Sequence, residues 1–97
     1  MSTTASAFRI DGELTIYRAA ELAADLKAAL AGVAGGGVFE LDLSGVTEMD
    51  SAGVQLLIAA RRSSQDSSRS LRVAAHSAAV ADVFDTLQLA SHFSDAH

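Results

Sequence analysis

Cysteine, proline and tryptophan are absent from the 97-residue chain, and the first two absences exclude whole classes of structure. Without cysteine there is no disulfide framework, no thiolate metal site and no cysteine nucleophile. Without proline, no cis-prolyl turn can shape the backbone. No apolar run approaches the roughly 20 residues that a membrane-spanning helix needs. Residues 1–7 also lack the basic and apolar regions of a signal peptide, so we expect a cytoplasmic protein.

Basic residues are also scarce. The chain has 7 lysines and arginines against 12 aspartates and glutamates, which gives a formal net charge of −5. Binding to nucleic acid or to an anionic membrane surface needs a cationic face, so the charge balance argues against both partners. Apolar residues make up 49% of the sequence, which is ordinary for a globular protein of one domain.

The first part of the chain predicts a hairpin followed by a helix. Two short alternating segments, 8–10 and 13–16, flank Asp11-Gly12, which is a strong two-residue turn signal. From Ala19 onward, apolar residues recur at helical spacing until a glycine-rich stretch breaks the run. The positions that define this helical face are Leu22, Leu26, Leu30 and Val33.

Strands and helices are expected to alternate along the middle of the chain. A mostly apolar strand is predicted over 38–43, a connection over 44–50, and a helix over 52–62. The serine-rich stretch 63–70 is expected to be a surface loop or a frayed helix end. A short strand over 71–74 follows it.

A third helix is predicted near the end of the chain. Ser77 is a suitable N-cap, and an apolar helical face follows it at Val80, Val83, Phe84 and Leu87. The chain then closes with an apolar segment that contains Leu89, His92 and Phe93. Because helices alternate with strands after the opening hairpin, the fold class is α/β, with right-handed crossovers.

The segment from Asp42 to Val54 predicts a buried strand, a tight loop and the start of a helix. Ser51 stands at that start, where backbone N–H groups lack helical partners and the helix dipole adds partial positive charge. Its hydroxyl is expected to be a good N-cap, and a phosphate attached to it would be well placed. Gly53 is expected to leave the first turn open to a partner, and Asp50 supplies an adjacent carboxylate. On the residues alone, Ser51 is either a simple cap or a regulatory site.

The run Leu41–Val46 followed by Met49–Gly53 resembles the signature of STAS domains. This family includes the bacterial anti-sigma factor antagonists and the C-terminal domains of sulfate transporters, and the resemblance covers nearly the whole chain. It implies a four- to five-stranded mixed sheet with three to four helices packed mainly on one face. It also implies a single STAS domain over 8–94, between a flexible tail at 1–7 and a tail at 95–97.

The resemblance further implies a regulatory switch that is not an enzyme and needs no cofactor. In the antagonists, the unphosphorylated protein binds an anti-sigma factor, a serine kinase of the GHKL type. This partner phosphorylates the serine after the aspartate, which is Ser51 here, and the complex separates until a phosphatase resets the cycle. The ATP site belongs to the partner. Many antagonists carry a second serine where this chain has Ala52, so one alternative acceptor is missing while Ser51 is kept.

The expected partner-binding surface combines the loop at Ser51, the first turns of the following helix and the loop at Gly12. Tyr17 is either a half-buried packing residue or an exposed anchor of the interface. Asp42 is expected to help shape the site. The full expected set is Asp50, Ser51, Ala52, Gly53, Gln55, Asp42, Gly12 and Tyr17. We expect a monomer or a weak dimer, since the first strand would present an exposed edge.

Two other functions fit the same resemblance. The opening from Gly12 to Ala20 is similar to STAS proteins linked to chemotaxis genes or to lipid-transport ABC complexes, in which the domain would be a docking scaffold. The other function is a nucleotide-binding STAS module, which the acidic loop around Ser51 disfavours.

Catalytic and metal sites are not predicted. The three histidines, His76, His92 and His97, include no pair at the i, i+4 spacing of a helical metal site. The Gly-x-Ser-x-Gly pattern of a hydrolase nucleophile does not occur. The glycines 35–37 lack the following Lys-Ser/Thr of a phosphate-binding loop, so they predict a flexible connection.

Overall fold

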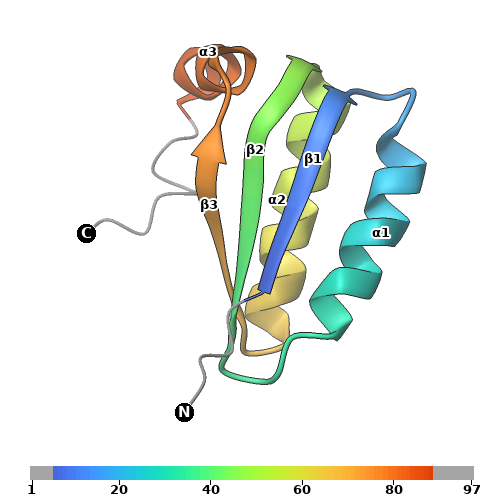
Figure 1. Ribbon diagram of the computed structural model, residues 1–97, viewed down its shortest axis with the longest axis vertical. Coiled ribbons are helices and arrows are strands. Elements are labelled where there is room, and N and C mark those ends of the chain that lie inside the picture. The colour runs from blue at the N-terminus through green and yellow to red at the C-terminus, as the bar shows by residue number, and fades with distance from the viewer. Residues whose placement is uncertain (1–5, 89–97) are drawn as a thin grey trace.

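Three strands and three helices alternate along residues 6–88, the part of the chain that the computed structural model describes (Figure 1). In chain order they are β1 (Ser6–Leu14), α1 (Ala19–Ala31), β2 (Val38–Met49), α2 (Ser51–Asp66), β3 (Ser70–His76) and α3 (Ala78–Leu87). The strands form one sheet in the order β1-β2-β3, and both pairings are parallel. The α/β class is confirmed. The expected mixed sheet of four to five strands is wrong for residues 6–88, which form a three-stranded parallel sheet.

The hairpin expected at Asp11-Gly12 does not form. β1 runs through both residues and stays paired with β2, so that Asp11 lies opposite Gly45 and Leu14 lies opposite Met49. Gly12 has φ +81°, and β1 shifts its register against β2 on both sides of the Asp11-Gly12 pair. The positive φ that can close a tight turn here produces an irregularity within a strand. Residues 13–14 therefore pair with β2, and not with residues 8–10 as a hairpin would require.

Two elements are longer than expected. β2 continues over residues 44–49, which were expected to form a connection, because its second half pairs with the end of β1 and buries Val46. α2 continues to Asp66, through the first half of the stretch 63–70 that was expected to be a surface loop or a frayed helix end. Ser64 is fully buried within it, and its hydroxyl donates a hydrogen bond to the carbonyl oxygen of Arg61, so a serine is accommodated inside the helix.

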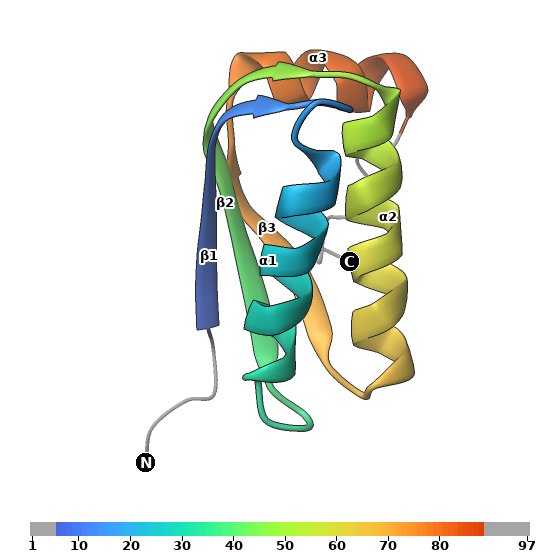
Figure 2. The ribbon, with the colours of Figure 1, turned by 90° about the vertical axis from the view of Figure 1, so that its right-hand side faces the viewer.

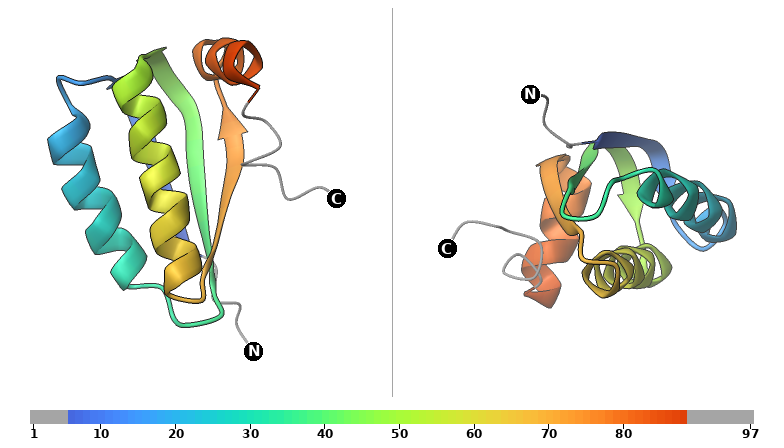
Figure 3. Two further views of the ribbon diagram at one scale, coloured as in Figure 1. Left: turned by 180° about the vertical axis from the view of Figure 1, so that it is seen from behind. Right: turned by 90° about the horizontal axis from the view of Figure 1, so that it is seen from below.

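The helices take two positions relative to the sheet. α1 and α2 lie side by side on one face, whereas α3 lies across the end of the sheet at which the strands finish (Figures 2 and 3). The predicted cap of α3 is confirmed, since the Ser77 hydroxyl accepts a hydrogen bond from the N–H of Val80 at 3.3 Å. The predicted closing segment with Leu89, His92 and Phe93 lies outside the described residues.

The core lies between the sheet and the helices that cover it. Alternate residues of β2 face the helices, and Phe39, Leu41 and Leu43 are each at most 1% exposed. The helical face predicted for α1 supplies the buried Leu22, Leu26 and Leu30. The alternate residues of β2 and the regularly spaced leucines of α1 therefore pack into one shared apolar layer.

The opposite face of the sheet carries charged side chains in cross-strand pairs. Arg9 on β1 contacts Asp42 on β2 at 3.0 Å, and Arg72 on β3 contacts Glu40 on β2 at 3.3 Å. Such pairs near solvent add little to the free energy of folding. Their consequence is a polar surface, so one face of the sheet is apolar and buried while the other is solvated.

Leu57 on α2 is completely buried in this core, and its replacement tests the packing of α2 on the sheet. We expect Leu57→Ala to lower the free energy of unfolding by about 2–5 kcal/mol, because the lost side chain leaves a cavity. Gln65→Ala, an exposed position on the same helix, is the matched control and should change it by less than about 0.5 kcal/mol. Urea denaturation measures both values, and equal losses would contradict the core assignment of Leu57.

Candidate functional site

α2 begins at Ser51, but the residue that caps it is Asp50. One carboxylate oxygen of Asp50 accepts a hydrogen bond from the backbone N–H of Gly53 at 3.1 Å. The expectation that the Ser51 hydroxyl is the N-cap is therefore wrong. Aspartate caps helices as well as serine does, and Asp50 has the extended backbone that a cap requires. Ser51 is instead an exposed residue of the first helical turn.

Asp50 also holds the loop between β1 and α1. Its other carboxylate oxygen accepts a hydrogen bond from the N–H of Ile16 at 3.1 Å, and its own N–H donates to the carbonyl oxygen of Leu14 at 3.3 Å. The hydrogen bond from Ile16 is the main reason that the pKa of Asp50 lies below its ordinary value, and the bond from Gly53 adds to the effect. One ionised side chain thus joins the end of β1 to the start of α2.

Gly53 is buried where the first turn of α2 passes the end of β1. A Cβ atom added at this position would lie 2.2 Å from the carbonyl oxygen of Leu14, so a glycine is required for this close approach. The expectation that Gly53 leaves the first turn open to a partner is therefore wrong, because Leu14 of β1 occupies the space beside it. Its missing side chain serves a contact within the chain.

A groove of about 270 Å³ lies beside Ser51, between the start of α2 and α3. Met49 and Val54 contribute apolar groups from the β2–α2 side, and Val83 and Leu87 contribute them from α3. The polar residues that complete the lining are Asp50, Ser51, Asp82 and Thr86. Ser51 is thus placed at the edge of a small apolar depression.

The α3 residues of this groove were not among the expected site residues. Val83 and Leu87 belong to the predicted apolar face of α3, but only Val80 and Phe84 of that face are buried. Leu87 is 50% exposed. The reason is the position of α3 across the end of the sheet, where fewer of its apolar residues meet the core. The spacing of these residues gives the width of the apolar face but not how much of it the fold covers, so the sequence held no signal that could have located the groove.

The loop between β1 and α1 lies at the same end of the molecule as α3 (Figure 1), and it carries two large apolar side chains that are exposed. Tyr17 is 89% exposed and Ile16 is 66% exposed. Of the two interpretations of Tyr17, half-buried packing is excluded, and the exposed ring fits an interface anchor. On α2, Ala52 is half-buried and Gln55 is exposed, both within the first turns after Ser51.

Two residues of the expected set lie elsewhere than predicted. Gly12 is part of β1, and the guanidinium group of Arg18 donates hydrogen bonds to the carbonyl oxygens on either side of it, those of Asp11 and Glu13. Asp42 lies on the polar face of the sheet, and the second half of β2 separates it from Ser51.

The carboxylate of Asp42 is satisfied on that polar face. It accepts hydrogen bonds from the N–H and the hydroxyl of Ser44 at 2.9 and 2.6 Å. The hydroxyl of Ser44 is the main cause that lowers the pKa of Asp42, with further contributions from its N–H and from Arg9. The structure therefore does not bring Asp42 to the Ser51 site.

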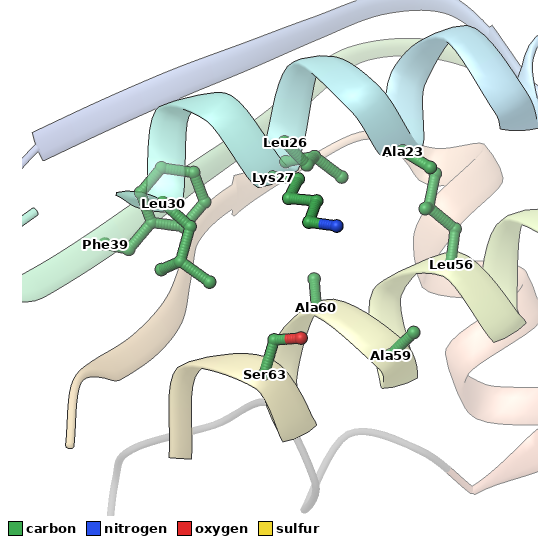
Figure 4. A pocket seen from close by; sticks show the side chains of 9 residues that line it. All are labelled: Ala23, Leu26, Lys27, Leu30, Phe39, Leu56, Ala59, Ala60 and Ser63. Carbon is green, nitrogen blue, oxygen red and sulfur yellow. The ribbon is translucent and has the colours of Figure 1, made fainter. Parts of the chain in front are cut away.

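A second hollow, of about 240 Å³, lies between α1 and α2 (Figure 4). Its walls are mostly apolar, and the side chain of Lys27 extends into the space between the helices. The helix residues that form the apolar walls are Ala23, Leu26, Leu30, Leu56, Ala59 and Ala60. It shares no lining residue with the groove at Ser51, so the two hollows are separate.

Residues 6–88 contain neither a grouped set of metal ligands nor a helix that could span a membrane. No three or more histidine, aspartate or glutamate side chains of this part of the chain are grouped so as to hold a metal ion. None of its helices is both long enough and apolar enough to cross a bilayer. His76 stacks on Phe84, with ring centroids 6.4 Å apart.

A family model described as "Mlab, STAS domain" matches residues 1–92. Two similar solved structures come from transporters. A sulfate transporter family protein from Wolinella succinogenes superposes with a TM-score of 0.73 at 17% identity, over 95% of this chain and 73% of that one. The STAS domain of a SulP transporter from Vibrio cholerae superposes with a TM-score of 0.73 at 14% identity, over 98% of this chain and 72% of that one.

A third similar structure is the anti-sigma factor antagonist SpoIIAA in its unphosphorylated form. Its TM-score is 0.51 at 16% identity, over 91% of this chain and 93% of SpoIIAA. A comparison with curated protein sequences gives no match. At these identities the three structures share the fold with this chain, and the fold alone.

The contact between Gly53 and β1 predicts that even a methyl group is costly there. We expect Gly53→Ala to lower the free energy of unfolding by about 1–3 kcal/mol, since the helix must move away from Leu14. Gly35→Ala is the control, because a Cβ at Gly35 would meet nothing within 4 Å, and its effect should stay within about 0.5 kcal/mol. Chemical denaturation compares them. A loss at Gly35 as large as that at Gly53 would argue against the close approach.

The lowered pKa of Asp50 predicts a dependence of stability on pH. The pKa of Asp50 in the folded chain lies below the value of about 3.9 in the unfolded chain, so its contribution is complete well above that value. The contribution is lost as the pH falls through the folded pKa. We expect the difference in Tm between wild type and Asp50→Asn, followed by circular dichroism, to be full above about pH 5 and to shrink below about pH 4. A difference that stays constant to pH 2 would contradict this assignment.

Proposed function

Because the chain belongs to the STAS domain family, we propose that it is a docking domain whose protein partner binds the end of the molecule around Ser51. STAS domains are generally non-enzymatic regulatory or scaffold domains that mediate contacts between proteins. We propose further that the docking is switched: the partner binds while Ser51 is unphosphorylated and leaves when Ser51 carries a phosphate.

The observation that carries the proposal is the surface around Ser51. The serine is exposed at the edge of an apolar groove, and Asp50 ties it to a loop that presents Ile16 and Tyr17 to solvent. Exposed apolar side chains that gather on one surface are typical of protein interaction sites, and tyrosine is enriched among the residues that dominate binding. A partner that covers this end of the domain would remove apolar area from water, which lowers the free energy of the complex.

The proposed switch follows from the chemistry of the serine. In a partner kinase of the GHKL type, the Ser51 oxygen forms a bond to the γ-phosphorus of ATP, the bond to the β-phosphate oxygen breaks, and ADP and the hydroxyl proton are released. The phosphoserine carries a charge of about −1.5 to −2 at neutral pH. A partner that covered it would have to desolvate this charge at the edge of an apolar groove, so the complex dissociates. A phosphatase then restores the serine.

A second candidate function is a permanent docking scaffold, for example on the ATPase of a lipid-transport ABC complex or in a chemotaxis-linked pathway. The exposed fractions of Ile16 and Tyr17 favour it, because large apolar side chains also suit an interface that never opens. In this case the same surface is used, but the hydroxyl of Ser51 has no regulatory role.

Mass spectrometry of the protein from its native cells, together with whatever co-purifies, separates the two functions. The switch predicts a phosphate on Ser51 and a GHKL-type kinase in the complex. With that kinase in hand, we expect Ser51→Ala to bind it as wild type does and Ser51→Asp to bind at least about tenfold more weakly, measured by calorimetry.

Ser63→Asp is the matched control for these binding measurements. It adds the same charge to an exposed serine of α2 that lies outside the groove at Ser51, and it should bind like wild type. Equal affinity for wild type and Ser51→Asp would overturn the switch. An unmodified Ser51 with a stoichiometric transporter ATPase would establish the scaffold instead.

A further inference from the structure

The carboxylate of Asp50 is the link between Ser51 and the exposed loop at Ile16 and Tyr17. One oxygen accepts the N–H of Gly53 in the first turn of α2, and the other accepts the N–H of Ile16, each at 3.1 Å. The two bonds use different oxygens of one side chain. Any change that pulls the carboxylate away from its position therefore acts on the helix start and on the loop together.

The apolar side chains of this loop are not held by burial. Ile16 and Tyr17 are 66% and 89% exposed, so the core contributes little to their position. Within residues 6–88, most hydrogen bonds of this loop are made with β1 or inside the loop. The guanidinium group of Arg18 donates to two carbonyl oxygens of β1, and the hydroxyl of Thr15 donates to Glu13. The N–H of Arg18 donates to the carbonyl oxygen of Thr15 at 2.9 Å, which is internal to the loop. The bond from the N–H of Ile16 to Asp50 is the one of these that reaches the start of α2.

A phosphate on Ser51 would compete directly with Asp50. Ser51 is the next residue along the chain and belongs to the same first turn, whose N–H groups attract negative charge. A phosphoserine brings three acceptor oxygens and a larger charge than the carboxylate does. It would draw the N–H of Gly53 away from Asp50 and repel the carboxylate beside it, and the bond from Ile16 would weaken as Asp50 moves.

We infer that Asp50 is a positioning residue that fixes the Ile16–Tyr17 loop to the start of α2, and that phosphorylation of Ser51 releases this loop. The inference rests on the proposed function and adds a route for the switch. The phosphate does not only place charge in the interface. It also removes the apolar side chains of Ile16 and Tyr17 from the positions in which the partner binds them.

The experiment compares three proteins: wild type, the chain with phosphoserine at residue 51, and Asp50→Asn. Asparagine is as good an N-cap as aspartate, so the variant keeps an acceptor for Gly53 but turns an amide N–H₂ group toward Ile16. We expect the Ile16 amide to exchange with solvent about tenfold faster in both altered proteins, since a hydrogen bond to a charged group is lost. The Arg18 amide, bonded within the loop, should change by less than about twofold.

The fluorescence anisotropy of Tyr17 gives a second readout. The chain has one tyrosine and no tryptophan, so its ultraviolet emission reports on this loop alone. We expect a faster local depolarisation in the phosphoserine-51 protein and in Asp50→Asn. A chain with phosphoserine at residue 63 is the matched control and should resemble wild type in both measurements.

The outcomes separate this inference from the proposed function. If phosphoserine 51 dissociates the partner while the Ile16 amide and the Tyr17 anisotropy stay as in wild type, the loop release is overturned and the switch stands. If the Arg18 amide accelerates as much as that of Ile16, the turn opens as a whole, and a specific link through Asp50 is overturned. If the Ile16 amide accelerates but the partner binds equally well, the link through Asp50 is supported and the proposed switch fails.

Discussion

The close approach between the first turn of α2 and the end of β1 is the constraint on which the rest of the site depends. It requires a residue without a side chain at Gly53, which meets the carbonyl oxygen of Leu14, and an acceptor at Asp50 for the N–H groups of both segments. In a parallel sheet the strands all finish at the same edge, so the loops after β1 and β2 meet there. The contact turns two separate loops into one surface that carries Ser51.

The polar face of the sheet and the end of the sheet near Ser51 differ in what a partner would have to cover. On the polar face, Arg9 and Arg72 pair with carboxylates of β2, so its charges are satisfied and solvated. At the end of the sheet, Ile16 and Tyr17 are apolar and exposed. Covering the first surface would cost the desolvation of charged groups, whereas covering the second removes apolar area from water. Although Asp50 and Asp82 also lie at this end, its exposed apolar area favours the end near Ser51 as the proposed docking surface.

The parts of the fold that could be predicted from the sequence are those set by local spacing. The leucines of α1 and the cap at Ser77 depend on neighbours within a few residues, and both are found as predicted. The turn signal at Asp11-Gly12 failed because a positive φ at glycine serves a tight turn and an irregular strand equally. Which one forms depends on the pairing partner, here β2. The cap at Asp50 was predicted one residue too late, at Ser51. Aspartate and serine are equally good caps, and the sequence does not fix the first residue of a helix to within one position.

The groove beside Ser51 could not be predicted at all, because it depends on where α3 lies. Spacing shows how wide the apolar face of a helix is, but not how much of it the fold covers. Val80 and Phe84 meet the core, whereas Leu87 stays half-exposed beside Ser51, because α3 crosses the end of the sheet instead of lying on its face. In so small a domain, an apolar face wider than the core can cover is itself a sign that another surface completes it. The uncovered part lies beside the one exposed serine that starts a helix in residues 6–88, so the proposed docking surface and the proposed regulatory serine occupy the same place.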